Sequence, residues 1–110
     1  MSFKAAFIAH APDADPDKHR TRLETGLYTL ITVLARDQKQ SLEICKELVR
    51  EEGVQSIILC PGFSTLDAGE IAQAAGPGVA VAVSRVDTPG ARVVREVMER
   101  EGWFSKASRA

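Results

Sequence analysis

Four stretches of the chain are apolar and of strand length, and each ends at a turn signal. The clearest is Ile57-Ile58-Leu59-Cys60, which meets the breaker pair Pro61-Gly62. A short apolar run bounded by turn residues is typical of a strand buried on both faces. The pattern therefore predicts strands over residues 3–9, 27–35, 54–60 and 79–86.

Segments with helical spacing separate these strands. After Asp37, which forms a capping-box pattern with Gln40, apolar residues recur three and four residues apart until the helix stop Gly53. A further helix is expected from about residue 65 to 75, with four residues facing inward: Leu66, Ile71, Ala72 and Ala75. Thr88-Pro89 begins the last helix and Gly102 ends it.

The segment after the first strand has weaker signals. Asp15-Pro16 supplies an N-cap residue followed by proline at the first helical position. We therefore predict a helix from there to about Glu24, ended by Gly26. Because this segment has few apolar residues, the predicted helix should lie on the surface.

Strand and helix alternate four times, which predicts an α/β fold. Short links imply a parallel sheet with right-handed crossovers. We expect a small three-layer sandwich with helices on both faces of a four-stranded parallel sheet, like a truncated flavodoxin-like or Rossmann-like domain. The expected strand order is 2-1-3-4, counted along the chain. Residues 1–104 should form a single domain, and residues 105–110 a polar tail.

Charge and composition exclude several classes of protein. The 110 residues carry 14 Lys and Arg against 15 Asp and Glu, and no long run of like charge. Binding to nucleic acid or to an anionic membrane therefore has no electrostatic support. No apolar run reaches the ~18 residues of a membrane span. Cys45 and Cys60 fit neither a metal nor a redox spacing, so we expect free thiols in a cytoplasmic protein.

The turn after the third strand is the main candidate for a ligand site. In α/β proteins ligands bind beyond the carboxyl ends of strands, and glycine lets a backbone approach a ligand closely. The start of the next helix favours an anion. The candidate residues run from Gly62 through Phe63 and Ser64 to Thr65. The alternative is that Ser64 and Asp67 only form a capping box.

Cys60 and His10 each follow a predicted strand and should face each other across the crevice. A thiol near a helix start can act as a nucleophile, with histidine as its base. However, Leu66 stands where a phosphatase loop needs arginine, and Phe63 where a rhodanese-like loop needs glycine. The alternative is that both residues are structural.

Arg85, near the end of the fourth strand, could hold a carboxylate or phosphate. Its alternative is an ion pair with Asp87 or Asp67. The acidic residues Asp13, Asp15 and Asp17 lack the glycine and terminal glutamate of a calcium loop, so no metal site is expected. No phosphate-binding loop or dinucleotide fingerprint is present, and the sequence therefore names no cofactor.

Four stretches carry a resemblance to a known family: Phe3-Lys4-Ala5-Ala6-Phe7-Ile8, Ala11 to Pro16 with His19-Arg20, Leu59-Cys60-Pro61-Gly62-Phe63, and Val83 to Asp87. Through them the chain resembles a family of small, uncharacterised bacterial α/β proteins, in which glycine is usual where Pro61 stands. The resemblance implies the fold class and a shared Cys60-Gly62-Phe63 turn, and it implies no activity.

The leading hypothesis is a domain that binds a small anionic metabolite at the carboxyl edge of its sheet. Gly62, Ser64 and Arg85 would hold the anion, while His10 and Cys60 would line the pocket. One alternative is an enzyme that uses Cys60 with His10. Another is a structural module without catalysis, assembled through an edge strand or the Trp103-Phe104 end, and we expect a homo-oligomer. Trp103 and Phe104 would then cover either the core or a partner.

Overall fold

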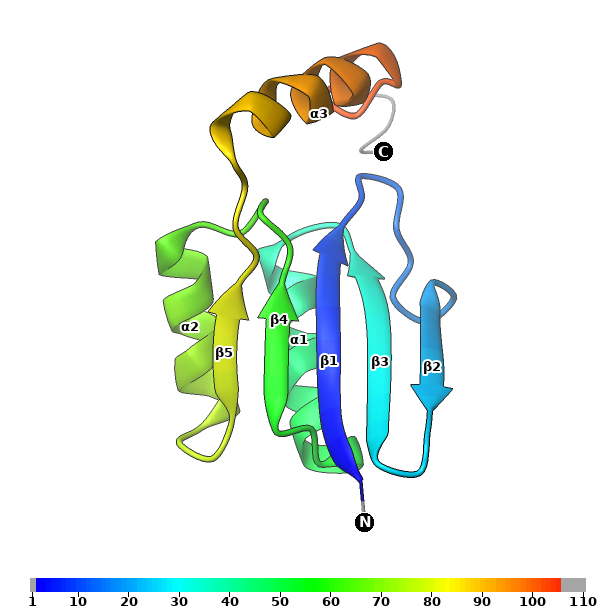
Figure 1. Cartoon of the computed structure of the whole chain (residues 1–110), viewed down its shortest axis with the longest axis vertical. Coiled ribbons are helices and arrows are strands. Elements are labelled where there is room, and N and C mark those ends of the chain that lie inside the picture. The colour runs from blue at the N-terminus through cyan, green and yellow to red at the C-terminus, as the bar shows by residue number, and fades with distance from the viewer. Residues whose placement is uncertain (1, 106–110) are drawn as a thin grey trace.

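The computed structural model describes residues 2–105, and these form a mixed five-stranded sheet with helices (Figure 1). Its strands stand in the order β2-β3-β1-β4-β5. Their bounds are Phe3–His10 (β1), Arg20–Glu24 (β2), Tyr28–Ala35 (β3), Ser56–Leu59 (β4) and Ala80–Val83 (β5). The α/β class is confirmed. The expected purely parallel sheet of four strands is wrong, because β2 adds an antiparallel edge strand beside β3.

The segment expected to be a helix up to Glu24 forms this extra strand instead. The N-cap signal at Asp15 is used in a single turn, in which its carbonyl accepts hydrogen bonds from the amides of Lys18 and His19. Residues 20–24 then pair with β3 from Arg20↔Val33 to Glu24↔Thr29. A helix with so few apolar residues would have little to bury, whereas the free edge of β3 offers a full set of backbone hydrogen bonds.

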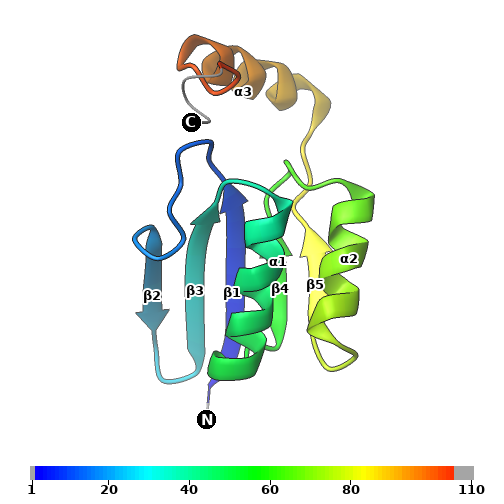
Figure 2. The same cartoon turned by 180° about the vertical axis from the view of Figure 1, so that it is seen from behind.

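The helices do not cover both faces of the sheet, so the expected three-layer sandwich is also wrong. Helices α1 (Gln38–Glu47) and α2 (Thr65–Ala75) lie side by side on the same face, as Figures 1 and 2 show from opposite sides. Because the chain passes from β1 to β3 through β2, it lacks the helix that was expected between these strands, and α3 lies at the carboxyl edge of the sheet. No helix of the described residues therefore covers the other, open face.

The core lies between the sheet and these two helices. Residues of β3 alternate between buried positions under the helices and partly exposed positions on the open face. In β1 the small Ala5 is buried as well, although it lies on the open face. Six fully or almost fully buried strand residues form the centre of the core: Ala6, Ile8, Ile31, Val33, Ile57 and Leu59. Helix α2 contributes Ile71 and Ala75, as expected, but Leu66 is 83% exposed and Ala72 is also exposed, so the inward positions predicted for these two are wrong.

The helix boundaries follow their capping residues. The Asp37 carboxylate accepts a hydrogen bond from the Gln40 amide at 2.9 Å, which confirms the predicted start of α1. The helix continues into a wider π-helical turn, η1 (Leu48–Glu52), and stops at Gly53, whose φ of 70° is readily adopted only by glycine.

Helix α3 (Thr88–Arg100) stands apart from both layers. It follows β5 after a short extended link and runs across the carboxyl edge of the sheet rather than along a face (Figures 1 and 2). None of its residues is buried. Within residues 2–105, no helix has the length and apolar character required to cross a membrane. The predicted polar tail lies, apart from Ser105, outside the described residues.

Candidate functional site

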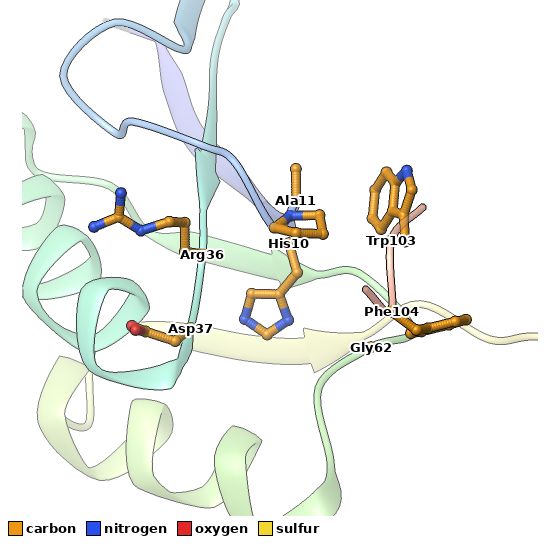
Figure 3. Close-up of a pocket in the computed structure, with 8 residues that line it drawn as sticks. His10, Ala11, Arg36, Asp37, Gly62, Trp103 and Phe104 are labelled. Carbon is orange, nitrogen blue, oxygen red and sulfur yellow. The ribbon is translucent and has the colours of Figure 1, made fainter. Parts of the chain in front are cut away.

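A cavity of about 520 Å³ opens at the carboxyl edge of the sheet, beneath the segment that follows α3 (Figure 3). Its volume lies in the usual range for sites that bind small molecules, which is roughly 300–1,000 Å³. The lining residues come from the ends of β1 and β3, from the turn after β4, and from the segment after α3: His10, Ala11, Pro12, Arg36, Asp37, Gly62, Trp103 and Phe104. The site therefore combines segments that are far apart in the sequence.

His10 is the last residue of β1, and its hydrogen bonds define its tautomer. The Ser41 hydroxyl donates its only proton to the carbonyl oxygen of Asp37 at 2.8 Å. The same hydroxyl oxygen lies 3.3 Å from His10 Nε2. We assign the imidazole proton to Nε2, because only this tautomer satisfies both contacts of the hydroxyl group. Within residues 2–105 nothing donates a hydrogen bond to its Nδ1, which is left as a base.

The surroundings of His10 favour its neutral form. Partial burial lowers the pKa of the imidazole from its ordinary value of 6.5, and the nearby carboxylates of Asp67 and Asp37 only partly oppose that effect. The ring also stacks on the buried ring of Phe63, with their centroids 4.0 Å apart and their planes 22° apart. The stack and the Ser41 contact hold the ring so that Nδ1 faces Gly62 and the cavity.

Gly62 leaves a small hollow between two reactive atoms. A Cβ atom added at Gly62 would lie 3.5 Å from His10 Nδ1 and 3.5 Å from Cys60 Sγ. Both atoms therefore border one space that any larger residue would fill. Cys60 is a partly buried free thiol, and its Sγ makes no hydrogen bond to the imidazole in the described residues. His10 and Cys60 thus lie near each other. Of the residues expected to line the pocket, however, only His10 and Gly62 do so; Cys60 and Phe63 are not among the lining residues.

Ser64 and Thr65 have a structural role in this arrangement. Ser64 is the N-cap of α2: its hydroxyl accepts a hydrogen bond from the Asp67 amide at 3.0 Å, and the Asp67 carboxylate accepts one from the Ser64 amide at 3.1 Å. Thr65 is the first residue of the helix. The capping box that we considered as the alternative at this turn is therefore present, and neither residue lines the cavity.

The arginine beside the cavity is Arg36 rather than Arg85. Arg36 follows β3, lines the cavity, and has no ion-pair partner within residues 2–105. Arg85 is not among the lining residues; its side chain is 85% exposed and its Nε lies 3.0 Å from the Asp87 carboxylate. The alternative considered for Arg85, an ion pair with Asp87, is therefore what the structure contains.

The aromatic residues after α3 form the side of the cavity opposite Arg36 and Asp37 (Figure 3). Trp103 is partly buried there, and its backbone amide donates to the carbonyl of Met98. Phe104 is half exposed and lies under the guanidinium of Arg95, 5.5 Å from its ring centroid. These rings give the cavity an apolar wall.

Sequence reasoning missed Arg36, Asp37 and Ser41 as parts of this site. A usable signal existed for the first two, because they directly follow a strand, as His10 and Cys60 do. Ser41 gave no such signal, since it resembles any polar residue in the first turns of a helix. In the part of the chain that the structure describes, no three His, Cys, Asp or Glu side chains gather as a metal site.

Comparison with known proteins gives a family and no activity. The model of a family of unknown function (DUF6506) matches residues 3–99. No curated protein and no solved structure matches the chain.

Proposed function

The chain belongs to this family of unknown function, and from the geometry of the cavity we propose that it binds a small, singly charged anionic molecule at the carboxyl edge of its sheet. The proposal is carried by two side chains that line one cavity: Arg36, which has no ion-pair partner within residues 2–105, and His10, whose Nδ1 we assign as the unprotonated ring nitrogen. An arginine side chain binds carboxylates and phosphates through two parallel hydrogen bonds.

The other walls narrow the class of ligand. His10 Nδ1 accepts a hydrogen bond, so it suits a ligand that also carries a hydroxyl or amine donor. Trp103 and Phe104 suit an apolar part of the ligand. The Asp37 carboxylate also borders the cavity and repels negative charge. A carboxylate with one negative charge, such as a hydroxy acid with an apolar side chain, therefore fits better than a phosphate with two.

Thermal unfolding with a panel of small carboxylates and phosphate esters tests this proposal. A ligand at about 100 times its dissociation constant adds about 2.7 kcal/mol to the free energy of unfolding. In a domain of this size that raises the melting temperature by on the order of 10 °C.

Two arginine variants make the test specific to the cavity. Arg36→Ala should weaken the binding of any hit at least roughly tenfold, because it removes a charge-assisted contact. Arg85→Ala is the matched control: Arg85 is exposed and lies outside the cavity, so the affinity should not change. An equal loss in both variants, or no loss in Arg36→Ala, would contradict the proposed site.

A second candidate function is supported by the shared hollow at Gly62. There His10 Nδ1 could accept the proton of the Cys60 thiol. The thiolate would then add to a carbonyl carbon of a bound molecule, whose π electrons move onto the carbonyl oxygen, and that oxygen takes the proton back from the imidazolium. This function predicts that iodoacetamide alkylates Cys60 rapidly near neutral pH, and that His10→Gln slows the reaction. Cys45 is the internal control, since burial raises the pKa of its thiol to about 12. If Cys60 reacts as slowly as Cys45, this candidate is excluded.

A further inference from the structure

The open face of the sheet is an apolar surface that no other part of residues 2–105 covers. Parallel strands are normally covered on both faces, because their side chains are apolar on both sides. Six large side chains point to the uncovered face by their alternation along β1, β3 and β4: Phe3, Phe7, Tyr28, Leu30, Leu34 and Ile58. The other strand positions on this face hold Leu23 and small uncharged residues. No charged residue therefore occupies a strand position on this face in the part of the chain that the structure describes.

Helix α3 carries a second apolar surface without a partner. Val93, Val94 and Val97 are 60%, 51% and 40% exposed and lie on one side of the helix. The charged residues occupy the other side, where they pair with each other as Arg92–Glu96 and Arg95–Glu99. A helix with such a stripe usually packs it against another element, and here nothing in the described chain covers it.

The helix does not cover the open face of its own sheet in this structure. Residues 84–87 join β5 to α3, a link of at most about 14 Å. Beyond the helix, Trp103 and Phe104 line the cavity beside His10. Both ends of α3 therefore lie at the carboxyl edge of the sheet (Figure 1). Its valine stripe remains available to a second molecule.

We infer that the chain forms a symmetric homodimer in which α3 of each copy packs its valine stripe on the open sheet face of the other. The valine stripe of α3 and the open face of the sheet match, since both surfaces are apolar and uncharged. In each copy, neither surface is covered by another part of the described residues. A second copy is therefore the partner that is always present with the required surface.

The area of contact favours reciprocal packing. A helix of 13 residues is ~20 Å long and ~10 Å wide, so it covers only about 200 Å² of a flat surface. Stable interfaces bury roughly 1,200–2,000 Å² over both partners. Two reciprocal contacts, each counted on both surfaces, give about 800 Å², to which the half-exposed Val86 of each copy adds. The interface therefore lies just below that range, and we expect a weak dimer. A one-way contact would be too small, and it would also build an open chain of molecules.

Analytical ultracentrifugation of three variants tests the dimer. Wild type should sediment as a dimer. Val94→Glu and Thr32→Glu, which place a charge in the stripe and on the open face, should each weaken association at least roughly tenfold. Thr32 is partly exposed in the single chain and lies opposite Phe7, so the variant should still fold, as circular dichroism would verify. Gln73→Glu, on the exposed side of α2, is the matched control and should remain dimeric. A monomeric wild type would overturn the inference.

Cross-linking with a short bis-maleimide then identifies the contact. One tagged chain carries Val94→Cys and a differently tagged chain carries Thr32→Cys, both in a Cys60→Ser background. The inference predicts a cross-linked species that contains both tags. A Thr32→Cys chain that cross-links efficiently to itself would instead indicate sheet-on-sheet packing. A single chain that carries both Val94→Cys and Thr32→Cys is tested as well, and cross-linking within that chain, without dimer, would indicate that α3 folds onto its own sheet. Either result would overturn the inference.

Discussion

Gly62→Ala separates the stability of the fold from the function of the cavity. The added methyl group would lie 3.5 Å from both His10 Nδ1 and Cys60 Sγ, which is an ordinary van der Waals distance. Gly62 also has no positive φ that would strain an alanine. The substitution further reduces the entropy of the unfolded chain, which stabilises a protein by about 0.4–1 kcal/mol. We therefore expect the melting temperature to stay the same or to rise by a few degrees.

The same methyl group should impair binding. It fills the hollow between the two atoms and covers the His10 Nδ1 lone pair, so a ligand can no longer donate a hydrogen bond there. Loss of one such hydrogen bond costs about 0.5–1.5 kcal/mol, and exclusion of the ligand from the hollow costs more. We expect the affinity for any hit of the thermal panel to fall about tenfold or more, measured by isothermal titration calorimetry.

Gly69→Ala provides the matched control. Gly69 lies inside α2 with open space around its Cα, so alanine should stabilise the helix by about 0.5–1 kcal/mol without affecting the cavity. Two results would refute the reasoning. A Gly62→Ala protein destabilised by several kcal/mol would mean that the turn is packed more tightly than described. Unchanged affinity in a stable Gly62→Ala protein would mean that ligands do not use the hollow.

Three further predictions concern individual side chains. Ser41→Ala removes the acceptor of the His10 Nε2 proton, so nitrogen NMR of the imidazole should show a mixture of tautomers; an unchanged spectrum would contradict the assignment. Because the pKa of His10 is lowered in the folded state, the unfolded chain binds the proton more readily. The contribution of neutral His10 to the free energy of unfolding should therefore be fully present above pH ~6.5 and should be lost as the pH falls below that value. Urea unfolding between pH ~7 and ~5.5 measures it. If His10→Gln shows the same fall in the free energy of unfolding as wild type, His10 is not its cause. Ile71→Ala should cost about 2–5 kcal/mol by urea unfolding and Leu66→Ala less than about 0.5 kcal/mol, since Ile71 is buried and Leu66 exposed; equal costs would contradict the orientation of α2.

Capping signals in the sequence correctly predicted the starts of two helices, because those starts depend only on residues close by in the chain. The caps at Asp37 and Ser64 place the starts of α1 and α2, because an N-cap requires only a side chain and an amide three residues later. The same kind of signal failed at Asp15. There the cap formed one turn, and pairing with β3 determined the structure of residues 20–24. The partner strand begins only four residues after Glu24, across a short loop that contains Gly26. This hairpin signal is local too, and the helix-start pattern at Asp15-Pro16 was wrongly preferred to it.

The sequence likewise predicted some residues of the candidate site and missed others. The rule that ligands bind beyond strand ends led to His10, Cys60 and Gly62, which the structure places around one hollow. The choice between Arg85 and Arg36 depends on which strand end lies beside the cavity and on local pairing with Asp87. The uncovered sheet face could not be foreseen, since the face on which each helix packs is a property of the connections as a whole.

The fluorescence emission of Trp103 tests most directly the claim that the cavity beside Arg36 and His10 binds a small anionic molecule. It is the only tryptophan of the chain, and it lines the cavity, so its fluorescence reports on that site alone. Titration of wild type with the strongest hit of the thermal panel should change the emission saturably. Arg36→Ala should shift the midpoint at least roughly tenfold higher, whereas Arg85→Ala should leave it unchanged. A ligand that raises the melting temperature without changing the Trp103 emission would bind elsewhere, and the proposed anion site would then be contradicted.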